Sequence, residues 1–176
     1  FLLALFTAYF FRNPKREFPQ LKGAIVSPAD GKVINIERCF EERFFKEEWI
    51  KISIFMSIFD VHINRIPISG EIIDILYHPG RFFAANMDKA SYANEQNTIL
   101  LETEQKKRVL LIQIAGFLAR RIICWIEKGS KVFTGQRFGL ICFGSRVELY
   151  LPLETEINIR VGQKIKGGET IVGYIR

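Results

Sequence analysis

The stretch Gly139-Leu-Ile-Cys-Phe-Gly-Ser-Arg-Val-Glu-Leu-Tyr-Leu-Pro152 decides how the whole chain is interpreted. Apolar residues on both sides of its centre, such as Ile141 and Val147, predict β-strand. The Gly144-Ser145 pair therefore falls inside β-structure, where a glycine usually marks a bulge or a close backbone approach. A second interpretation is that Ser145 attacks the carbonyl group of Gly144 and the chain cleaves itself there. The dipeptide does not decide between the two, so the rest of the sequence must.

Composition describes one folded domain with an anionic partner. The chain has 176 residues, of which 48% are hydrophobic and 25% charged, which excludes a disordered protein. A net charge of +6 predicts binding to nucleic acid or to acidic lipid. The aromatic residues lie mostly in apolar strand patterns rather than on polar stacking surfaces, so we expect a membrane surface and no nucleic acid.

The cysteine pattern points to a reducing compartment. Cys39, Cys124 and Cys142 are too few and too scattered for a disulfide framework. No Cys-x-x-Cys or histidine-rich spacing indicates zinc, so we expect no metal.

The N-terminus is an apolar segment followed by basic residues. Residues 1–11 are almost entirely apolar, but a membrane-spanning helix needs about 20 such residues. We therefore expect residues 1–16 to associate with a membrane as the end of a longer anchor, with a buried terminal helix as the alternative. Arg12, Lys15 and Arg16 favour the cytoplasmic side of the cell membrane and attract anionic headgroups.

Residues 17–176 have the periodicity of a single β-rich domain. The Asp30-Gly31 pair is a hairpin signal between apolar runs at 24–26 and 32–36. Residues 49–58 alternate like a strand, and residues 98–102 and 108–114 predict a hairpin with its turn at 104–107. Residues 81–97 form a long polar segment, of a kind that is more often functional than not.

An internal repeat indicates the architecture. Residues 129–136 parallel residues 162–169, and each copy runs on into an apolar strand. Two copies are too few for a solenoid but suit a pseudo-symmetric pair of hairpins, as in barrel-sandwich domains of the lipoyl and biotinyl type. We predict a mostly β fold (α+β at most) with two packed antiparallel sheets, these hairpins and an N-terminal apolar helix.

Three residues have the chemistry of serine acyl transfer. Histidine is the usual neutral-pH base, and the chain has only two, His62 and His78. His62 follows a predicted strand, Asp30 lies at a strand-end turn, and Ser145 follows a glycine. Nucleophile, base and orienting acid can occur in any chain order, so Ser145, His62 and Asp30 are the candidate set. For Asp30 the simpler role is to form the turn.

Five stretches carry a resemblance to a known family. Phe143-Gly-Ser-Arg-Val-Glu-Leu-Tyr-Leu-Pro152 resembles the processing site of the phosphatidylserine decarboxylase family in its short, membrane-anchored form. The other stretches match the same family in the same order: Tyr9-Phe-Phe-Arg-Asn-Pro-Lys-Arg16, Ser27-Pro-Ala-Asp-Gly31, Phe59-Asp-Val-His-Ile-Asn-Arg-Ile-Pro67, and Tyr77-His-Pro-Gly-Arg-Phe82 running on to Asn94-Glu-Gln-Asn97.

The resemblance implies a self-processing enzyme. By it, Ser145 is the residue that becomes a pyruvoyl group, His62 the base and Asp30 the acid that orients the base. Cleavage between Gly144 and Ser145 would divide the domain into a β chain (1–144) and an α chain (145–176). The pyruvoyl group would then serve decarboxylation of phosphatidylserine, or of an ether-lipid analogue, to phosphatidylethanolamine and CO₂.

Further expectations concern partners. Arg81, Asn86 and Asn97 in the long polar segment are candidate contacts for the lipid headgroup. The expected partners are the anionic phospholipid, the membrane surface and the two cleaved chains, and a homodimer is left open.

Two alternatives from other classes remain. Met87-Asp88-Lys89-Ala90 resembles the modified hairpin of a lipoyl or biotinyl carrier, although the residues around Lys89 do not read as strands. A non-catalytic, membrane-peripheral β module is the other alternative, but it leaves Asp30, His62 and Ser145 unexplained.

Overall fold

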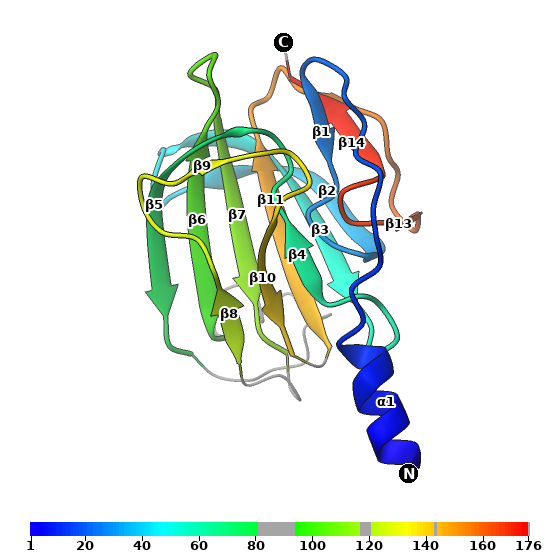
Figure 1. Ribbon diagram of the computed structural model, residues 1–176. Coiled ribbons are helices and arrows are strands. Elements are labelled where there is room, and N and C mark those ends of the chain that lie inside the picture. The colour runs from blue at the N-terminus through cyan, green and yellow to red at the C-terminus, as the bar shows by residue number, and fades with distance from the viewer. Residues whose placement is uncertain (81–93, 117–120, 143, 176) are drawn as a thin grey trace.

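The computed structural model describes residues 1–80, 94–116, 121–142 and 144–175 as one helix and a β-rich body (Figure 1). About half of the chain is strand, which confirms the mostly β prediction. The described elements are α1 (Leu2–Phe10), β1 (Ala24–Val26), β2 (Gly31–Glu41), β3 (Glu47–Met56), β4 (Ile63–Arg65), β5 (Gly70–His78), β6 (Gln96–Glu102), β7 (Arg108–Ile114), β8 (Ile122–Cys124), β9 (Lys131–Val132), β10 (Arg137–Ile141), β11 (Ser145–Leu151), β12 (Glu156–Ile157), β13 (Lys164–Ile165) and β14 (Ile171–Tyr174).

A large curled sheet packs against two small ones. The large sheet has the order β13-β2-β3-β11-β7-β6-β5-β9, and the small sheets have the orders β1-β14-β12 and β4-β10-β8. All of these pairings are antiparallel. Residues from all three sheets, such as Ile54, Phe138 and Val172, form one buried core. The predicted antiparallel layers are therefore present, with the second layer divided into two.

Strand β11 lies in the centre of the large sheet and is covered on both faces. Val147 and Leu149 point into the main core. On the opposite face Tyr150 and Phe44 pack against a second apolar cluster that includes Ile112. The strand therefore alternates: Arg146 and Glu148, buried as an ion pair at 3.4 Å, lie on the same face as Tyr150.

The sequence predicted one hairpin correctly and another wrongly. Strands β6 and β7 pair from Glu102↔Arg108 to Gln96↔Ile114, as expected except that β6 begins two residues earlier. The Asp30-Gly31 turn does not close a hairpin, because β1 pairs with β14 and β2 pairs with β3 and β13. This turn instead carries the chain from a small sheet to the large one.

The internal repeat corresponds to a structural pseudo-symmetry. Strands β9 and β13 lie at opposite edges of the large sheet, and the strands that follow them, β10 and β14, are the central strands of the two small sheets. Equivalent backbone bonds hold the two copies: Gly135 N–H donates to Ile66 O and Gly168 N–H donates to Ser27 O, both at 2.8 Å. The two glycines have left-handed φ angles of 79° and 80°.

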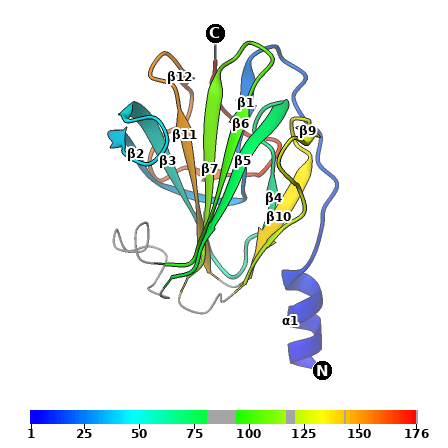
Figure 2. The same ribbon diagram turned by 90° about the vertical axis from the view of Figure 1, so that its left-hand side faces the viewer.

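Helix α1 projects from one end of the body, and the β6–β7 turn lies at the other end (Figures 1 and 2). Helix α1 has nine residues, and no helix of the described ranges is long and apolar enough to cross a membrane.

The repeat glycines give a stability test with a matched control. Alanine at Gly129 or Gly135 must adopt a left-handed φ, which costs about 1–2 kcal/mol. A Cβ at Gly129 would meet nothing, whereas one at Gly135 would overlap the Phe18 ring that lies beside Arg65. We expect Gly135→Ala to lower the free energy of unfolding more than Gly129→Ala does, as measured by urea denaturation. Equal losses would show that Phe18 does not pack there in solution.

Candidate active site

Ser145 is the first residue of β11 and is completely buried. It pairs with Met56, the last residue of β3, and its Oγ donates to Met56 Sδ at 3.5 Å. A thioether sulfur is a weak acceptor, so the hydroxyl proton is held loosely. The preceding Gly144 has a left-handed φ of 59°, a conformation that favours glycine at this position.

His62 lies immediately before β4, next to the segment that leads to Ser145. Its carbonyl oxygen accepts a hydrogen bond from Ile141 N–H (3.4 Å), four residues before the serine. Its Nδ1 lies 2.9 Å from Asp60 O. Because a carbonyl oxygen can only accept, Nδ1 carries the proton and Nε2 carries the free lone pair. His62 is therefore held in the tautomer that a base at Nε2 requires.

The environment of His62 keeps it neutral. Its Nε2 is buried and has no hydrogen-bond partner among the described residues. The ring of Phe10, the last residue of α1, lies 4.1 Å from the imidazole between centroids, with an angle of 32° between the planes. Burial lowers the pKa of His62 to about 4, although the hydrogen bond to Asp60 acts in the opposite direction. At neutral pH the group can accept a proton.

His62 and Ser145 belong to the same corner of the core. His62 directly precedes β4 and lies two residues before Asn64. Asn64 Nδ2 lies 3.6 Å from Met56 Sδ, the sulfur to which Ser145 also donates. The start of β4, the end of β3 and the start of β11 therefore meet at one sulfur atom.

Asp30 occupies a different set of contacts. Its Oδ2 accepts from Arg16 Nη2 at 2.7 Å and its Oδ1 accepts from Gly167 N–H at 2.8 Å. Burial raises the pKa of this carboxyl group, while both partners lower it. Within the described ranges no hydrogen bond joins Asp30 to His62. The structure therefore links His62 and Ser145 through neighbouring residues (Ile141, Asn64 and Met56), and it bonds Asp30 to Arg16 of the N-terminal segment.

The bond to Gly167 belongs to the fold itself. At the equivalent place in the other copy, Ser69 Oγ accepts from Thr134 N–H at 2.9 Å. The turn role that the sequence suggested for Asp30 thus has a pseudo-symmetric counterpart. The ion pair of Asp30 with Arg16 has no counterpart at Ser69, whose side chain bonds to Thr134 within the described residues.

Arg16 has a different role from the one the sequence suggested. Its side chain is 6% exposed and forms ion pairs with Asp30 and Glu169, at 2.7 and 3.2 Å. Arg12 donates to Phe59 O at 2.7 Å and lies over the Tyr9 ring. These two arginines tie the N-terminal segment to the body, and the basic run gave no sign of that.

The candidate headgroup residues are placed only in part. Arg81 and Asn86 lie outside the described residues. Asn97 lies within β6 rather than in a loop, is 3% exposed, and donates from Nδ2 to Gln113 Oε1 at 2.9 Å. In this structure Asn97 is therefore an interior residue.

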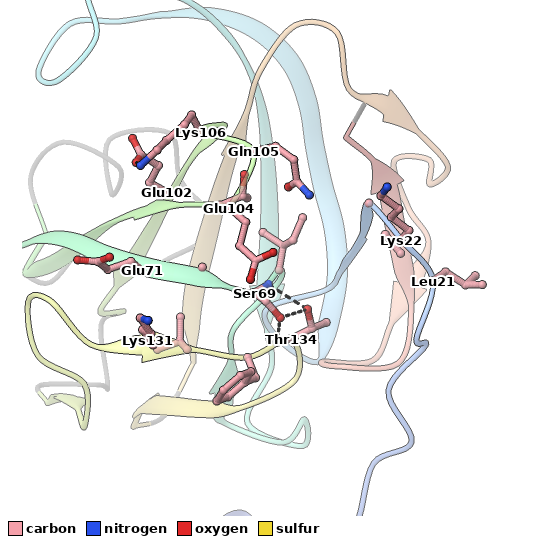
Figure 3. Close-up of a pocket in the computed structure, with 17 residues that line it drawn as sticks. Leu21, Lys22, Ser69, Glu71, Glu102, Glu104, Gln105, Lys106, Lys131 and Thr134 are labelled. Atoms are coloured by element: carbon pink, nitrogen blue, oxygen red, sulfur yellow. Dashed lines mark hydrogen bonds and ion pairs between the residues drawn. The ribbon is translucent and has the colours of Figure 1, made fainter.

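Neither a metal cluster nor the pocket beside the β6–β7 turn marks the site. The described ranges contain no group of three His, Cys, Asp or Glu side chains that could hold a metal ion. A pocket of about 500 Å³ lies beside the β6–β7 turn, lined by lysines and glutamates and by the paired hydroxyls of Ser69 and Thr134 (Figure 3). Asp30, His62 and Ser145 do not line it, so it is separate from the candidate active site.

Comparisons with known proteins identify the family. A family model described as Phosphatidylserine decarboxylase matches residues 3–173. Phosphatidylserine decarboxylase proenzymes from Syntrophus aciditrophicus and Desulfotalea psychrophila are 52% and 48% identical, over 96% and 99% of this chain and 79% and 82% of their own lengths. The proenzyme of the same name from Rickettsia felis is 46% identical over 98% of this chain and 76% of its own. The chain belongs to the phosphatidylserine decarboxylase family.

Proposed function

We propose that this chain decarboxylates phosphatidylserine, or an ether-lipid analogue, to phosphatidylethanolamine and CO₂ with a pyruvoyl group made from Ser145. The similar proteins are named as decarboxylases, which are carboxy-lyases, and as proenzymes. The observation that carries the proposal is the buried Ser145 hydroxyl, which follows a left-handed glycine and shares its corner with a neutral His62. A pyruvoyl group at this position fits the dry, apolar surroundings that favour loss of CO₂.

The first step is an acyl shift from nitrogen to oxygen. His62 Nε2 takes the proton from Ser145 Oγ, and Oγ forms a bond to the carbonyl carbon of Gly144. The carbonyl electrons move to oxygen and return as the C–N bond breaks, while His62 gives the proton to the departing amine. The product is an ester between Gly144 and the side chain of residue 145.

The second step releases the two chains. Loss of the Cα proton of residue 145 breaks its Cβ–Oγ bond and frees the Gly144 carboxylate. The remaining enamine takes up one water and loses ammonia, which leaves the pyruvoyl group at the start of the fragment 145–176. That group supplies an electron-accepting carbonyl for decarboxylation of an amine-bearing substrate.

The carrier alternative gains little from the fold. The pseudo-symmetric hairpins resemble the barrel-sandwich pattern, but Lys89 lies outside the described residues.

We also propose that α1 holds the protein at the cytoplasmic face of the cell membrane. Leu2, Leu3 and Leu5 on α1 are exposed, and so is Phe59 beside the helix. Arg12 and Arg16 are engaged with the body, which leaves Lys15 as the exposed cation of the basic run.

The catalytic set is tested by following maturation. Ser145→Ala should give a folded, uncut and inactive chain, because the nucleophile is gone. His62→Ala should slow cleavage by about 10²–10⁴-fold or more, since it removes the base. Asp30→Asn should slow cleavage without abolishing it, and His78→Ala should cut normally as the control. Cleavage is followed by mass spectrometry with circular dichroism to confirm folding. A folded His62→Ala that matures at the wild-type rate would show that His62 is not the base.

The packing of Phe10 on His62 predicts a pH dependence. The unfolded chain binds the His62 proton with an ordinary pKa of about 6.5, more tightly than the folded chain does at about 4. The free energy of unfolding should therefore fall as pH drops from about 6.5 towards 4. Phe10→Ala should admit water, raise the pKa of His62 and weaken this dependence, whereas Leu3→Ala should not. Proton NMR titration in a Ser145→Ala background measures the pKa of His62 in both variants. An unchanged pKa in Phe10→Ala would refute the packing.

Membrane attachment should depend mainly on apolar contact. Replacement of Leu2, Leu3 and Leu5 by Ser should abolish co-sedimentation with anionic vesicles. Lys15→Gln should weaken binding by about 1 kcal/mol. Lys106→Gln should not, because Lys106 belongs to the β6–β7 turn at the opposite end of the body. Unaltered binding after the leucine changes would place the contact elsewhere.

A further inference from the structure

Three buried side-chain amides cross the core and end at the active-site corner. Asn97 Nδ2 donates to Gln113 Oε1 at 2.9 Å, and Gln113 Nε2 donates to Asn64 Oδ1 at 2.8 Å. The three residues belong to β6, β7 and β4, and each is at most 3% exposed. Buried side-chain networks of this kind fix the orientation of their members.

A glycine makes room for this chain of amides. Gly139 of β10 pairs with Asn64 of β4, and a Cβ at Gly139 would lie 2.3 Å from Ile123 O and 3.0 Å from Gln113 Nε2. Without a side chain at that point, Gln113 can reach from the large sheet to the small one.

The direction of the amide chain follows from its last member. The thioether of Met56 can only accept, so the atom of Asn64 that faces it at 3.6 Å is the amide nitrogen. Asn64 Oδ1 must then accept from Gln113, which leaves Gln113 Oε1 to accept from Asn97. The buried amide of Asn64, a strong donor, thus faces Met56 Sδ, which is a weak acceptor. The hydroxyl group of Ser145 donates to the same sulfur atom.

We propose that Asn64 stabilises the Ser145 oxygen during self-cleavage, with Gln113 and Asn97 as positioning residues. This inference rests on the proposed function. As the Oγ proton passes to His62 Nε2, Oγ gains negative charge and becomes a far better acceptor than Met56 Sδ. Asn64 Nδ2–H then donates to Oγ until Oγ has bonded to the carbonyl carbon of Gly144. No proton leaves Asn64, so the balance of the acyl shift is unchanged.

The decisive variant is Asn64→Leu, with Asn94→Leu as its control. Asn94 is also buried and its amide donates to Ala115 O at 2.7 Å, outside the network. Removal of one donor to a developing oxyanion typically slows a reaction by about 10²–10³-fold. We expect Asn64→Leu to slow cleavage by that factor and Asn94→Leu to cleave at close to the wild-type rate, both followed by mass spectrometry on folded protein.

Hydroxylamine shows which step is slowed. It attacks the ester and releases residues 1–144 as a hydroxamate together with a fragment that begins with Ser145. We expect no such fragments from Asn64→Leu, because the variant stalls before the ester forms. Accumulated ester would show that Asn64 acts after the acyl shift and would overturn the proposal.

Gln113→Leu provides a second route if Asn64→Leu does not fold. The substitution removes the hydrogen bond that orients the Asn64 amide. We therefore expect slower cleavage, and the reaction should again stop before the ester forms. Wild-type rates in a folded Asn64→Leu or Gln113→Leu would overturn the inference alone. A wild-type chain that never cleaves would instead overturn the proposed function.

Discussion

The burial of the Ser145 hydroxyl against a sulfur atom is the constraint on which the site depends. Antiparallel pairing of β11 with β3 places Ser145 opposite Met56, in a core position with no exposed surface. A stronger acceptor would hold the proton, and an exposed serine would be solvated. The pairing leaves Ser145 with a loosely held hydroxyl proton, which suits its proposed role as the nucleophile with His62 as the base.

The pseudo-symmetric fold explains how distant segments supply this corner. One copy of the repeat ends in β10, which pairs with β4 and precedes β11 in the chain. His62 lies just before β4 and bonds to Ile141 at the end of β10, and Ser145 begins β11. The other copy supplies Gly167, which binds Asp30. Asp30 is also ion-paired with Arg16 of the segment that follows α1, and Phe10 at the end of α1 packs on His62. The helix proposed to meet the membrane is therefore in contact with the proposed base.

Much of this fold could be predicted from local sequence, and the site only in part. Alternation and turn chemistry predicted the β6–β7 hairpin, β3 and the repeat, because these depend on neighbouring residues. The Asp30-Gly31 turn was misread because a turn signal does not say which strands will pair. The family motifs pointed to Ser145 and His62, but no motif marks Met56 or Gln113 as their neighbours. Those contacts join strands far apart in the chain, as does the bond of Arg16 to Asp30.

The most direct test is the intact mass of the purified, denatured protein. The account predicts two chains, residues 1–144 and residues 145–176, with the smaller one lighter by one ammonia than a peptide that begins with serine. Borohydride should change the mass of that smaller chain only. A single chain of 176 residues that decarboxylates phosphatidylserine with Ser145 intact would contradict it.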